Sequence, residues 1–301
     1  MSEKILLMDG NYILRRSFYG VPELKTSKGF PTNAIKGTLN TILYTLDNYK
    51  PDKFIMVYDY PAPTFRHLMY NSYKATREET PEEFKKQRGL VDTVISLMGF
   101  TVIQKAGYEA DDIIGTIAKT ESANGNEVML YSADHDMFQL IDSNISQIIP
   151  GHMNQPDTIW TPQDVKNKHS VTPEQFVYVK ALMGDKSDNI PGVTGIGPKT
   201  AEKLIAEYGN LECVYSHLAD IKSKSIADKL SDSWENVMLS YTLVRIKKDV
   251  PLLEITETGL NKTCGVIPEN KLNDSSRSML ELLEMKSIIS VLENGSIVRV
   301  D

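Results

Sequence analysis

Three apolar runs of strand length in the first half of the chain each end in an aspartate. They are KILLMD, which ends at Asp9, KFIMVYD, which ends at Asp59, and EVMLYSADHD, which continues to Asp134 and Asp136. Segments with helical patterns lie between them, at 33–48, 82–98 and 110–123. Because alternating strands and helices are typical of a mostly parallel sheet, we expect an α/β fold with a central sheet flanked by helices.

Two further short runs, TVIQ at 101–104 and ISQII at 145–149, are candidate strands of the same sheet. In an open α/β sheet, ligands bind beyond the carboxyl ends of the strands. The aspartates at the strand ends should therefore meet at one edge of the sheet.

The segment GYEADDIIGTIA places Glu109, Asp111 and Asp112 within four positions, just before helix-spaced isoleucines. On a regular helix Glu109 and Asp112 are about 60° apart, but Asp111 points elsewhere. All three converge only if the helix begins near Ala110, which the preceding Gly107 and the preference of acids for a first helical turn favour. The alternative, that one acid caps the helix and the others are solvated, stays open from the pattern alone.

The composition changes after residue 150, where a polar, proline-bearing stretch leads into short helices joined by glycine-rich turns. We divide the chain into an α/β core at 1–170, a helical region at 171–260, and a tail at 261–301. The tail carries SMLELLEMKSIISVL, which predicts one amphipathic helix that packs on the body.

The segment LMGDKSDNIPGVTGIGPKTAEKLI, at 182–205, predicts a helix, a tight hairpin and a second helix. Gly192, Gly195 and Gly197 would let the backbone approach a ligand closely, and the start of the second helix, with Lys199 and Thr200, can hold a phosphate. Ordinary turn chemistry explains such glycines equally well. The nearby pair Asp185 and Asp188 makes a coincidence harder to accept.

Nine acids now fall at strand ends or helix starts: Asp9, Asp59, Glu109, Asp111, Asp112, Asp134, Asp136, Asp185 and Asp188. Like charges at short range raise each other's pKa or need a compensating cation, and oxygen ligands favour hard ions such as Mg²⁺ or Mn²⁺. Two such ions roughly 3.5 to 4 Å apart would activate a water and stabilise the leaving oxygen of a phosphodiester. The histidines show no ligand pairing, and we interpret His135 as a loop side chain.

The segment TFRHLMYNSYKATREETPEEFKKQR, at 64–88, interleaves basic residues, Arg66 among them, with Tyr70 and Tyr73. Such a pattern suits phosphate contacts and base stacking on single strands. Four glutamates offset much of the charge, so a solvated helical surface is the alternative. Because the segment follows Asp59 directly, it should overhang the acidic edge.

The net charge of −7 argues against non-specific coating of nucleic acid. No apolar run approaches the roughly 20 residues of a membrane helix, no signal peptide is recognisable, and Cys213 and Cys264 form no metal spacing. We therefore expect a cytoplasmic protein without membrane contact.

These motifs resemble the 5′ nuclease family, which includes the N-terminal nuclease domain of bacterial DNA polymerase I, flap endonucleases and bacteriophage 5′-exonucleases. LLMDGNYILRRSFY, YDYPAPTFRHLMYNSYKATR, GYEADDIIGTIA, SADHDMFQLI and LMGDKSDNIPGVTGIGPKTA stand in the family's order at similar spacing. The resemblance spans most of the chain and implies a PIN-like nuclease core, a helical arch near 64–90 and a C-terminal helix-hairpin-helix.

The resemblance also implies roles for individual residues. The first metal would be held by Asp9, Asp59, Glu109, Asp111 and Asp112, and the second by Asp134, Asp136, Asp185 and Asp188. In the arch, Lys74 and Arg77 would meet the scissile phosphate beside Tyr73. Duplex backbone, with a bound K⁺, would lie on the hairpin at Gly192, Gly195, Gly197, Lys199 and Thr200.

The activity implied is Mg²⁺-dependent 5′-3′ exonuclease and flap endonuclease cleavage of DNA with a 5′ flap, nick or single-stranded 5′ end, and removal of RNA primers. We expect a monomer that acts in replication and repair, with replication proteins as partners. Because no polymerase follows the domain, the chain looks like a free-standing nuclease of a bacterium or bacteriophage. The residues at 60–63, YPAP, replace a small basic turn common in relatives, which bears on a phosphate contact and not on the metal site.

Three alternatives remain from the sequence. A catalytically silent DNA-junction binder would keep the same fold, but the acids at all nine matched positions speak against it. A phosphatase would need neither the hairpin nor the basic segment. A single-metal exonuclease is also open.

Overall fold

A six-stranded sheet forms the centre of the computed structural model, which describes residues 2–152, 155–256 and 259–294. The strand order is β3-β2-β1-β4-β5-β6. The strands are β1 (Lys4–Asp9), β2 (Lys53–Val57), β3 (Thr101–Ile103), β4 (Glu127–Tyr131), β5 (Ile145–Ile149) and β6 (Thr158–Trp160). Strands β1 to β5 are parallel and β6 pairs antiparallel with β5, so the predicted mostly parallel α/β sheet is confirmed.

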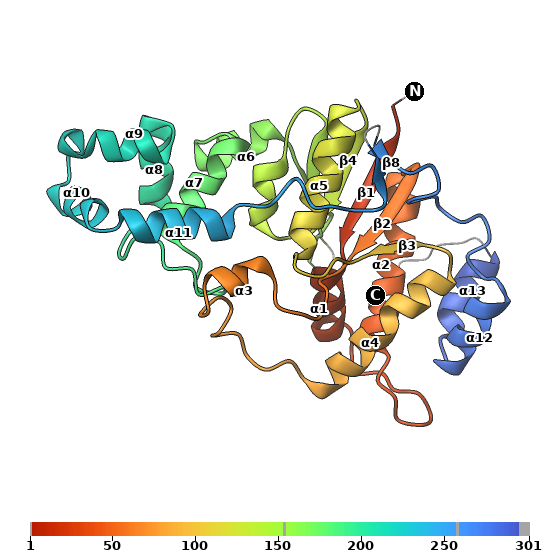
Figure 1. Cartoon of the computed structure of the whole chain (residues 1–301). Helices are drawn as coiled ribbons and strands as arrows, with labels where there is room; N and C mark the ends of the chain where they lie inside the picture. The colour runs from red at the N-terminus through yellow and green to blue at the C-terminus, as the bar shows by residue number, and fades with distance from the viewer. Residues whose placement is uncertain (1, 153–154, 257–258, 295–301) are drawn as a thin grey trace.

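Helices cover both faces of this sheet (Figure 1). On one face, Leu6 and Met8 of β1 pack among residues of α1 (Gly10–Gly20), α2 (Asn33–Tyr49) and α4 (Glu82–Leu97). On the other face, Ile5 and Leu7 pack against α5 (Ala110–Ala123). Successive side chains of a strand point to opposite faces, so a strand that is covered on both sides is apolar throughout. That requirement explains the uninterrupted KILLM run.

A helical region extends from the β5–β6 side of the sheet (Figure 1). It comprises α6 (Pro162–His169), α7 (Pro173–Met183), α8 (Pro198–Tyr208), α9 (Leu211–Ser216), α10 (Lys224–Ser231) and α11 (Trp234–Val244), with the 3₁₀ turns η1 (His135–Leu140) and η2 (Leu218–Asp220). Ile149 of β5 and Trp160 of β6 pack against its apolar core, so this region lies directly on the edge of the sheet. Helix α7 starts with Pro173 behind a capping box made by Thr172 and Gln175.

The C-terminal segment is a helical hairpin and not the single helix predicted from its sequence. Helix α12 (Asp274–Leu282) ends before Glu284, whose backbone is left-handed at φ 56°, and α13 (Lys286–Asn294) follows. The carboxylate of Glu284 accepts a hydrogen bond from the Ser27 backbone at 3.0 Å, so a contact far away in the sequence fixes the break. Both helices pack on the body, next to α4 and α2.

A short hairpin of β7 (Ile255–Thr256) and β8 (Gly259–Leu260) precedes this segment. Within the described ranges, no helix combines the length and apolar character that a bilayer crossing requires.

Candidate active site

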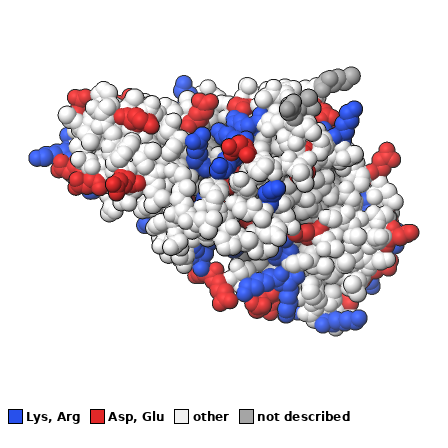
Figure 2. Space-filling view, viewed as in Figure 1, with Lys and Arg blue, Asp and Glu red and all other residues white. Residues whose placement is uncertain are grey.

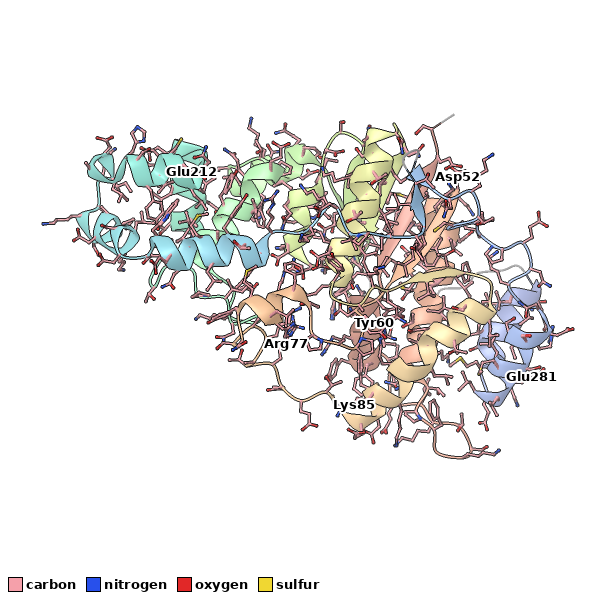
Figure 3. The ribbon with its side chains drawn as sticks, viewed as in Figure 1. Asp52, Tyr60, Arg77, Lys85, Glu212 and Glu281 are labelled. Carbon is pink, nitrogen blue, oxygen red and sulfur yellow. The ribbon has the colours of Figure 1, made fainter. Side chains whose placement is uncertain are left out.

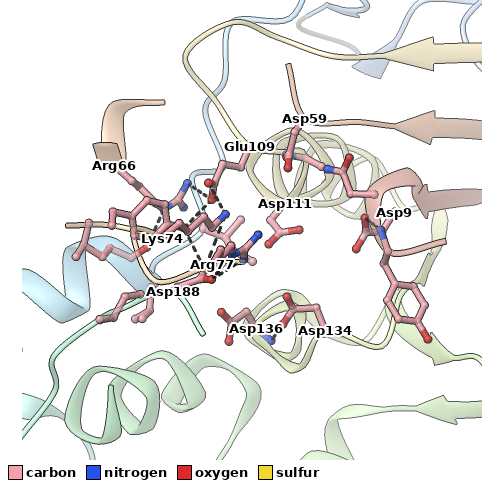
Figure 4. A pocket seen from close by; sticks show the side chains of 18 of the residues that line it. Asp9, Asp59, Arg66, Lys74, Arg77, Glu109, Asp111, Asp134, Asp136 and Asp188 are labelled. Atoms are coloured by element: carbon pink, nitrogen blue, oxygen red, sulfur yellow. Dashed lines mark hydrogen bonds and ion pairs between the residues drawn. The ribbon is translucent and has the colours of Figure 1, made fainter. Parts of the chain in front are cut away.

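An acidic pocket of about 300 Å³ opens at the carboxyl ends of β1, β2 and β4. Of the nine predicted metal ligands, seven line it: Asp9, Asp59, Glu109, Asp111, Asp134, Asp136 and Asp188. Figure 4 shows these carboxylates around one space, together with three basic side chains, Arg66, Lys74 and Arg77. The expected gathering of acids at one sheet edge is thus present in the fold.

Hydrogen bonds from neighbouring elements fix Asp9, the last residue of β1, and Asp59, which lies two residues beyond β2. Asp9 caps α1, since its Oδ1 accepts from the Tyr12 backbone at 3.0 Å, and its Oδ2 accepts from Ser132 Oγ at 2.8 Å. Asp59 accepts from the backbone N–H of Ala110, the first residue of α5, at 2.7 Å. Each carboxylate is therefore oriented before any ligand arrives.

Helix α5 begins at Ala110, as the sequence predicts, but only two of its three acids face the pocket. Asp112 is fully buried and its carboxylate accepts from the backbone N–H of Glu109 at 3.1 Å and of Lys247 at 2.9 Å. Arg66 donates to both of its oxygens, at 2.7 and 2.8 Å. The prediction that Asp112 is a metal ligand is corrected: its capping position turns it away from the pocket and toward these donors.

Arg66 is a buried structural residue here, and the prediction that it contacts DNA is corrected. Its side chain is 3% exposed. Besides Asp112, it donates to Glu109 at 3.2 Å and to the backbone oxygens of Leu243 and Arg245 at 2.7 and 3.0 Å. These bonds occupy the guanidinium and tie α3 (Phe65–Met69) to α5 and to the end of α11.

Lys180 of α7 forms ion pairs with two of the acids predicted to hold the second metal, Asp136 and Asp185. Its Nζ lies 2.7 Å from a carboxylate oxygen of Asp136 and 2.7 Å from one of Asp185. Asp185 also accepts hydrogen bonds from Ser187 and does not line the pocket, so its role as a metal ligand stays a prediction. Burial alone would raise the pKa of Asp185. The Lys180 ammonium and the hydrogen bonds from Lys180 and Ser187 outweigh burial and lower this pKa to about 2. No pattern in the sequence marks Lys180 as a partner of these acids.

The predicted arch residues reach into the pocket from the segment after α3. Lys74 Nζ lies 2.6 Å from Glu109 Oε1, and Arg77 Nε lies 3.1 Å from Asp188 Oδ1. The hydroxyl of Tyr73 donates to Glu109 at 2.9 Å, and its side chain is only 4% exposed. The idea that Tyr73 stacks on a base is therefore corrected, because its ring is buried in the core of the helical region.

The arch itself is less helical than predicted for residues 64–90. Helix α3 has five residues, a turn and an irregular stretch follow, and α4 starts only at Glu82. In Figure 3, Arg77 lies near α3 and Lys85 lies on α4, at the two ends of this stretch. The segment borders the acidic pocket through Lys74 and Arg77.

The crowded carboxylates give the pocket a negative electrostatic potential. Burial, with the neighbouring acids, raises the pKa of Asp9 to about 7 and that of Asp136 to about 7, and it raises the pKa of Asp111 well above 3.8. After burial, the main causes of the raised pKa of Asp111 are the carboxylates of Asp134, Asp9, Glu109 and Asp59. Among the described residues, none forms a hydrogen bond or ion pair with the Asp111 side chain.

This donor set fits a divalent cation. Carboxylate oxygens are the ligands that hard ions prefer, and a cation beside Asp111 would offset the repulsion that its neighbours create. As the described side chains stand, no three acidic, histidine or cysteine groups converge on one point closely enough to hold an ion. Binding would therefore require the carboxylates on the pocket walls to move inward, and Lys74 to release Glu109.

The pocket is also lined by three residues of α1 that were not predicted from the sequence: Asn11, Tyr12 and Arg15. Helical spacing from Asp9 could have found them, because a capping aspartate at a strand end places the first turns of the next helix beside it. The Arg15 guanidinium lies 5.3 Å from the centre of the Phe84 ring. His135 is the first residue of the 3₁₀ turn η1 and not a loop residue as predicted, and it stacks on Phe138 outside the pocket.

The segment between α7 and α8 reaches the acidic pocket through Asp188, whereas its glycine turn at 192–197 lies outside the pocket. Gly192 and Gly195 adopt positive φ angles of 57° and 80°, and a Cβ on Gly192 would come within 2.3 Å of the Gly184 backbone nitrogen. Lys199 and Thr200 occupy the first turn of α8 behind Gly197, where Lys199 is exposed. The glycines are thus required by the backbone, and the helix start is open to a ligand.

Comparison with known families matches almost the whole chain. Residues 4–170 match the 5'-3' exonuclease N-terminal resolvase-like domain, and residues 171–263 match the 5'-3' exonuclease C-terminal SAM fold. The chain is 38% identical over 289 residues to the thermostable DNA polymerase I of Thermus thermophilus, a match covering 95% of this chain and 33% of the polymerase. DNA polymerase I of Bacillus subtilis is 35% identical over 258 residues, or 86% of this chain and 29% of the polymerase. The chain thus spans about a third of the length of these relatives.

Solved structures share the fold. Bacteriophage T5 5′-exonuclease with bound zinc superposes with a TM-score of 0.66 at 23% identity, covering 93% of this chain and 99% of the phage protein. The catalytic core of Rad2 in complex with DNA substrate gives a TM-score of 0.61 at 16% identity, covering 97% of this chain and 92% of that core. These likenesses confirm the central sheet with its attached helical region.

Proposed function

The chain belongs to the 5′-3′ exonuclease family, and from this membership and its acidic pocket we propose that it is a structure-specific 5′ nuclease. It would hydrolyse phosphodiesters in DNA with a 5′ flap, nick or single-stranded 5′ end, and in RNA primers on DNA. The observation that carries the proposal is the set of seven carboxylates around one pocket, where neighbouring acids together with burial raise the pKa of Asp111.

We propose Mg²⁺ as the natural cofactor, with Mn²⁺ as a substitute. The residues that would hold it are those with carboxylates in the pocket, foremost Asp9, Asp59, Glu109, Asp111 and Asp134. When bound, one or two such ions supply the positive charge that activates water and stabilises the leaving oxygen of a phosphodiester. The family relative with bound zinc supports a divalent ion without deciding which one.

The basic residues at the pocket mouth would orient the scissile phosphate. Lys74 and Arg77 hold pocket acids by ion pairs in the free protein, at 2.6 Å in the case of Lys74. A phosphate that enters the pocket offers both groups an anionic partner, and a preorganised cation stabilises the negative charge that develops during cleavage. Arg15 lines the same pocket and would contact the phosphate from α1.

The hairpin between α7 and α8 would bind the backbone of the downstream duplex. Backbone N–H groups at the start of α8, with Lys199 and Thr200, are suited to a phosphate. We also propose a K⁺ site at the hairpin. The ammonium of Lys229 already lies close to the hairpin, because a Cβ on Gly195 would come within 2.7 Å of Lys229 Nζ.

The test is incubation of the purified protein with 5′-labelled flap, nicked and blunt duplex DNA, with Mg²⁺ and with EDTA. Short products from the flap that require Mg²⁺ would support the nuclease. Tight binding of the flap without cleavage in any divalent ion would instead indicate a silent junction binder of the same fold.

A further inference from the structure

A second cleft lies beside the acidic pocket, between α3 and the segment that joins α11 to β7. Its volume is about 560 Å³. Phe65 and Met69 of α3 form an apolar side, and Met69 is 49% exposed. The opposite side carries Arg245, Lys247 and Lys248. Figure 2 shows basic side chains gathered over this part of the molecule.

The basic residues of this cleft are poorly neutralised. The Lys247 ammonium lies 3.8 Å from the carboxylate of Asp249, which also lines the cleft, and 5.6 Å from the centre of the Phe65 ring. In the described part of the chain, neither Arg245 nor Lys248 forms an ion pair with a carboxylate. Burial, with Lys119 and Arg245 nearby, lowers the pKa of Lys248. Repulsion among unpaired cations is relieved by an anion, which gives the cleft a preference for a negatively charged occupant.

The cleft and the acidic pocket share a wall. Ile246 lines both, while its neighbours Leu243 and Val244 line the acidic pocket and Arg245 lines the cleft. Arg66 holds this wall in place through its bonds to the backbone oxygens of Leu243 and Arg245. A chain of phosphates that leaves the acidic pocket past α3 would therefore meet Arg245, Lys247 and Lys248 next.

We propose that this cleft binds the single-stranded 5′ arm of the substrate. Phosphates of the arm contact Lys247 and Lys248, and a base or sugar packs on Phe65 and Met69. Alternating apolar and cationic side chains are the combination that single-stranded nucleic acid needs. The site rests on the proposed function for its substrate, but it can be tested without cleavage.

The binding test compares the protein with the double variant Lys247→Gln and Lys248→Gln, using a fluorescent single-stranded oligonucleotide in EDTA. Neither ammonium contacts the acidic pocket, and Lys247 reaches Asp112 only through its backbone, so the substitutions leave that pocket intact. Loss of two phosphate contacts should weaken binding about 5- to 20-fold at low salt and make the salt dependence less steep by about one unit or more.

The matched control is Lys28→Gln with Lys286→Gln, which removes the same charge from exposed positions beside Glu284, at the other end of the molecule. It should bind the oligonucleotide like the unaltered protein. An equal loss of oligonucleotide binding in this control would mean that only the total charge of the protein matters, and would overturn the proposal that the cleft binds the arm. Unchanged binding by the Lys247 and Lys248 variant would overturn it too.

The cleavage test distinguishes binding of the single-stranded arm from binding of the duplex. The Lys247 and Lys248 variant should raise KM for a flap with an arm of about 15 nucleotides by roughly 5-fold or more, and leave KM for a nicked duplex without an arm unchanged. A similar rise for the nick would place duplex in the cleft and overturn the proposal. If the unaltered protein cuts neither substrate, the proposed nuclease function is wrong. The binding test still decides whether the cleft binds single-stranded DNA.

Discussion

The ammonium nitrogen of Lys74 lies 2.6 Å from Oε1 of Glu109, so a basic side chain neutralises an acid that would otherwise face the pocket. The same residue should act on phosphate once a divalent ion holds the acid. Lys74→Ala should therefore lower flap cleavage at saturating Mg²⁺ roughly 10²-fold or more, as loss of other preorganised contacts to developing charge does.

Metal affinity should change in the opposite direction, because Lys74 competes with the cation for Glu109. Titration with Mn²⁺ by calorimetry should show equal or tighter binding in Lys74→Ala. Lys85→Ala is the control, since the ion pairs of Lys85 within the described ranges are those with Glu79 and Glu82 at the surface. A Lys74 variant that cleaves at the normal rate would remove this segment from the chemistry.

Asp111 has no partner among the described residues, and this predicts opposite effects on stability and activity. Asp111→Asn removes a half-buried charge that its neighbours repel, so the protein in EDTA should melt at a higher temperature, by about 2–4 °C for each kcal/mol gained. Cleavage should nearly vanish, because a carboxylate that a cation needs is gone. Calorimetry and the flap assay measure the two quantities, and a lower melting temperature in EDTA would contradict this description of Asp111.

The start of α5 illustrates which parts of the site the sequence reveals. Helix capping is local, so Ala110 could be identified as the first helical residue from its neighbours alone. Whether the third helical residue, Asp112, faces a metal or the protein depends on Arg66 and Lys247, which lie far from it in the sequence. The same limit explains the C-terminal helix, whose break at Glu284 is stabilised by Ser27.

The convergence of the strand-end acids was predictable for a related reason. Parallel strands bring their carboxyl ends to one edge whatever their loops do, so Asp9, Asp59 and Asp134 needed only the strand assignment. Lys180 could not be foreseen, because its place between Asp136 and Asp185 follows from how α7 packs against η1.

The ion pair of Arg66 with Asp112 predicts a large loss of stability when one partner is removed. Arg66→Met leaves the fully buried Asp112 carboxylate without its main counter-charge, which typically costs about 3–5 kcal/mol. Asp112→Asn should also destabilise the protein, and any loss of cleavage should then follow loss of fold. Urea unfolding measures both, and the double variant Arg66→Met with Asp112→Leu should cost less than the sum of the single changes.

The raised pKa values of Asp9, Asp111 and Asp136 predict that the metal-free protein loses stability as pH rises. Between about pH 4 and pH 7 the folded protein binds more protons than the unfolded chain, because Asp9 titrates at about 7 when folded and at 3.8 when unfolded. The free energy of unfolding therefore falls with increasing pH in that window. Urea midpoints in EDTA should show this slope, and Mn²⁺ should flatten it. A stability that rises with pH in EDTA would contradict the raised pKa values.

Gly192 at the start of the hairpin has φ 57°, and it has no room for a side chain, since a Cβ would lie 2.3 Å from the Gly184 nitrogen. Gly192→Ala should therefore force the two backbone segments apart, lower the free energy of unfolding and weaken binding to nicked duplex. Gly197→Ala is the control for stability, because Gly197 has an extended backbone with φ −97° and nothing within 4 Å of the added methyl. Thermal melts and duplex binding by anisotropy measure the effect. If Gly192→Ala melts like Gly197→Ala and binds nicked duplex like the unaltered protein, the hairpin backbone does not need this glycine.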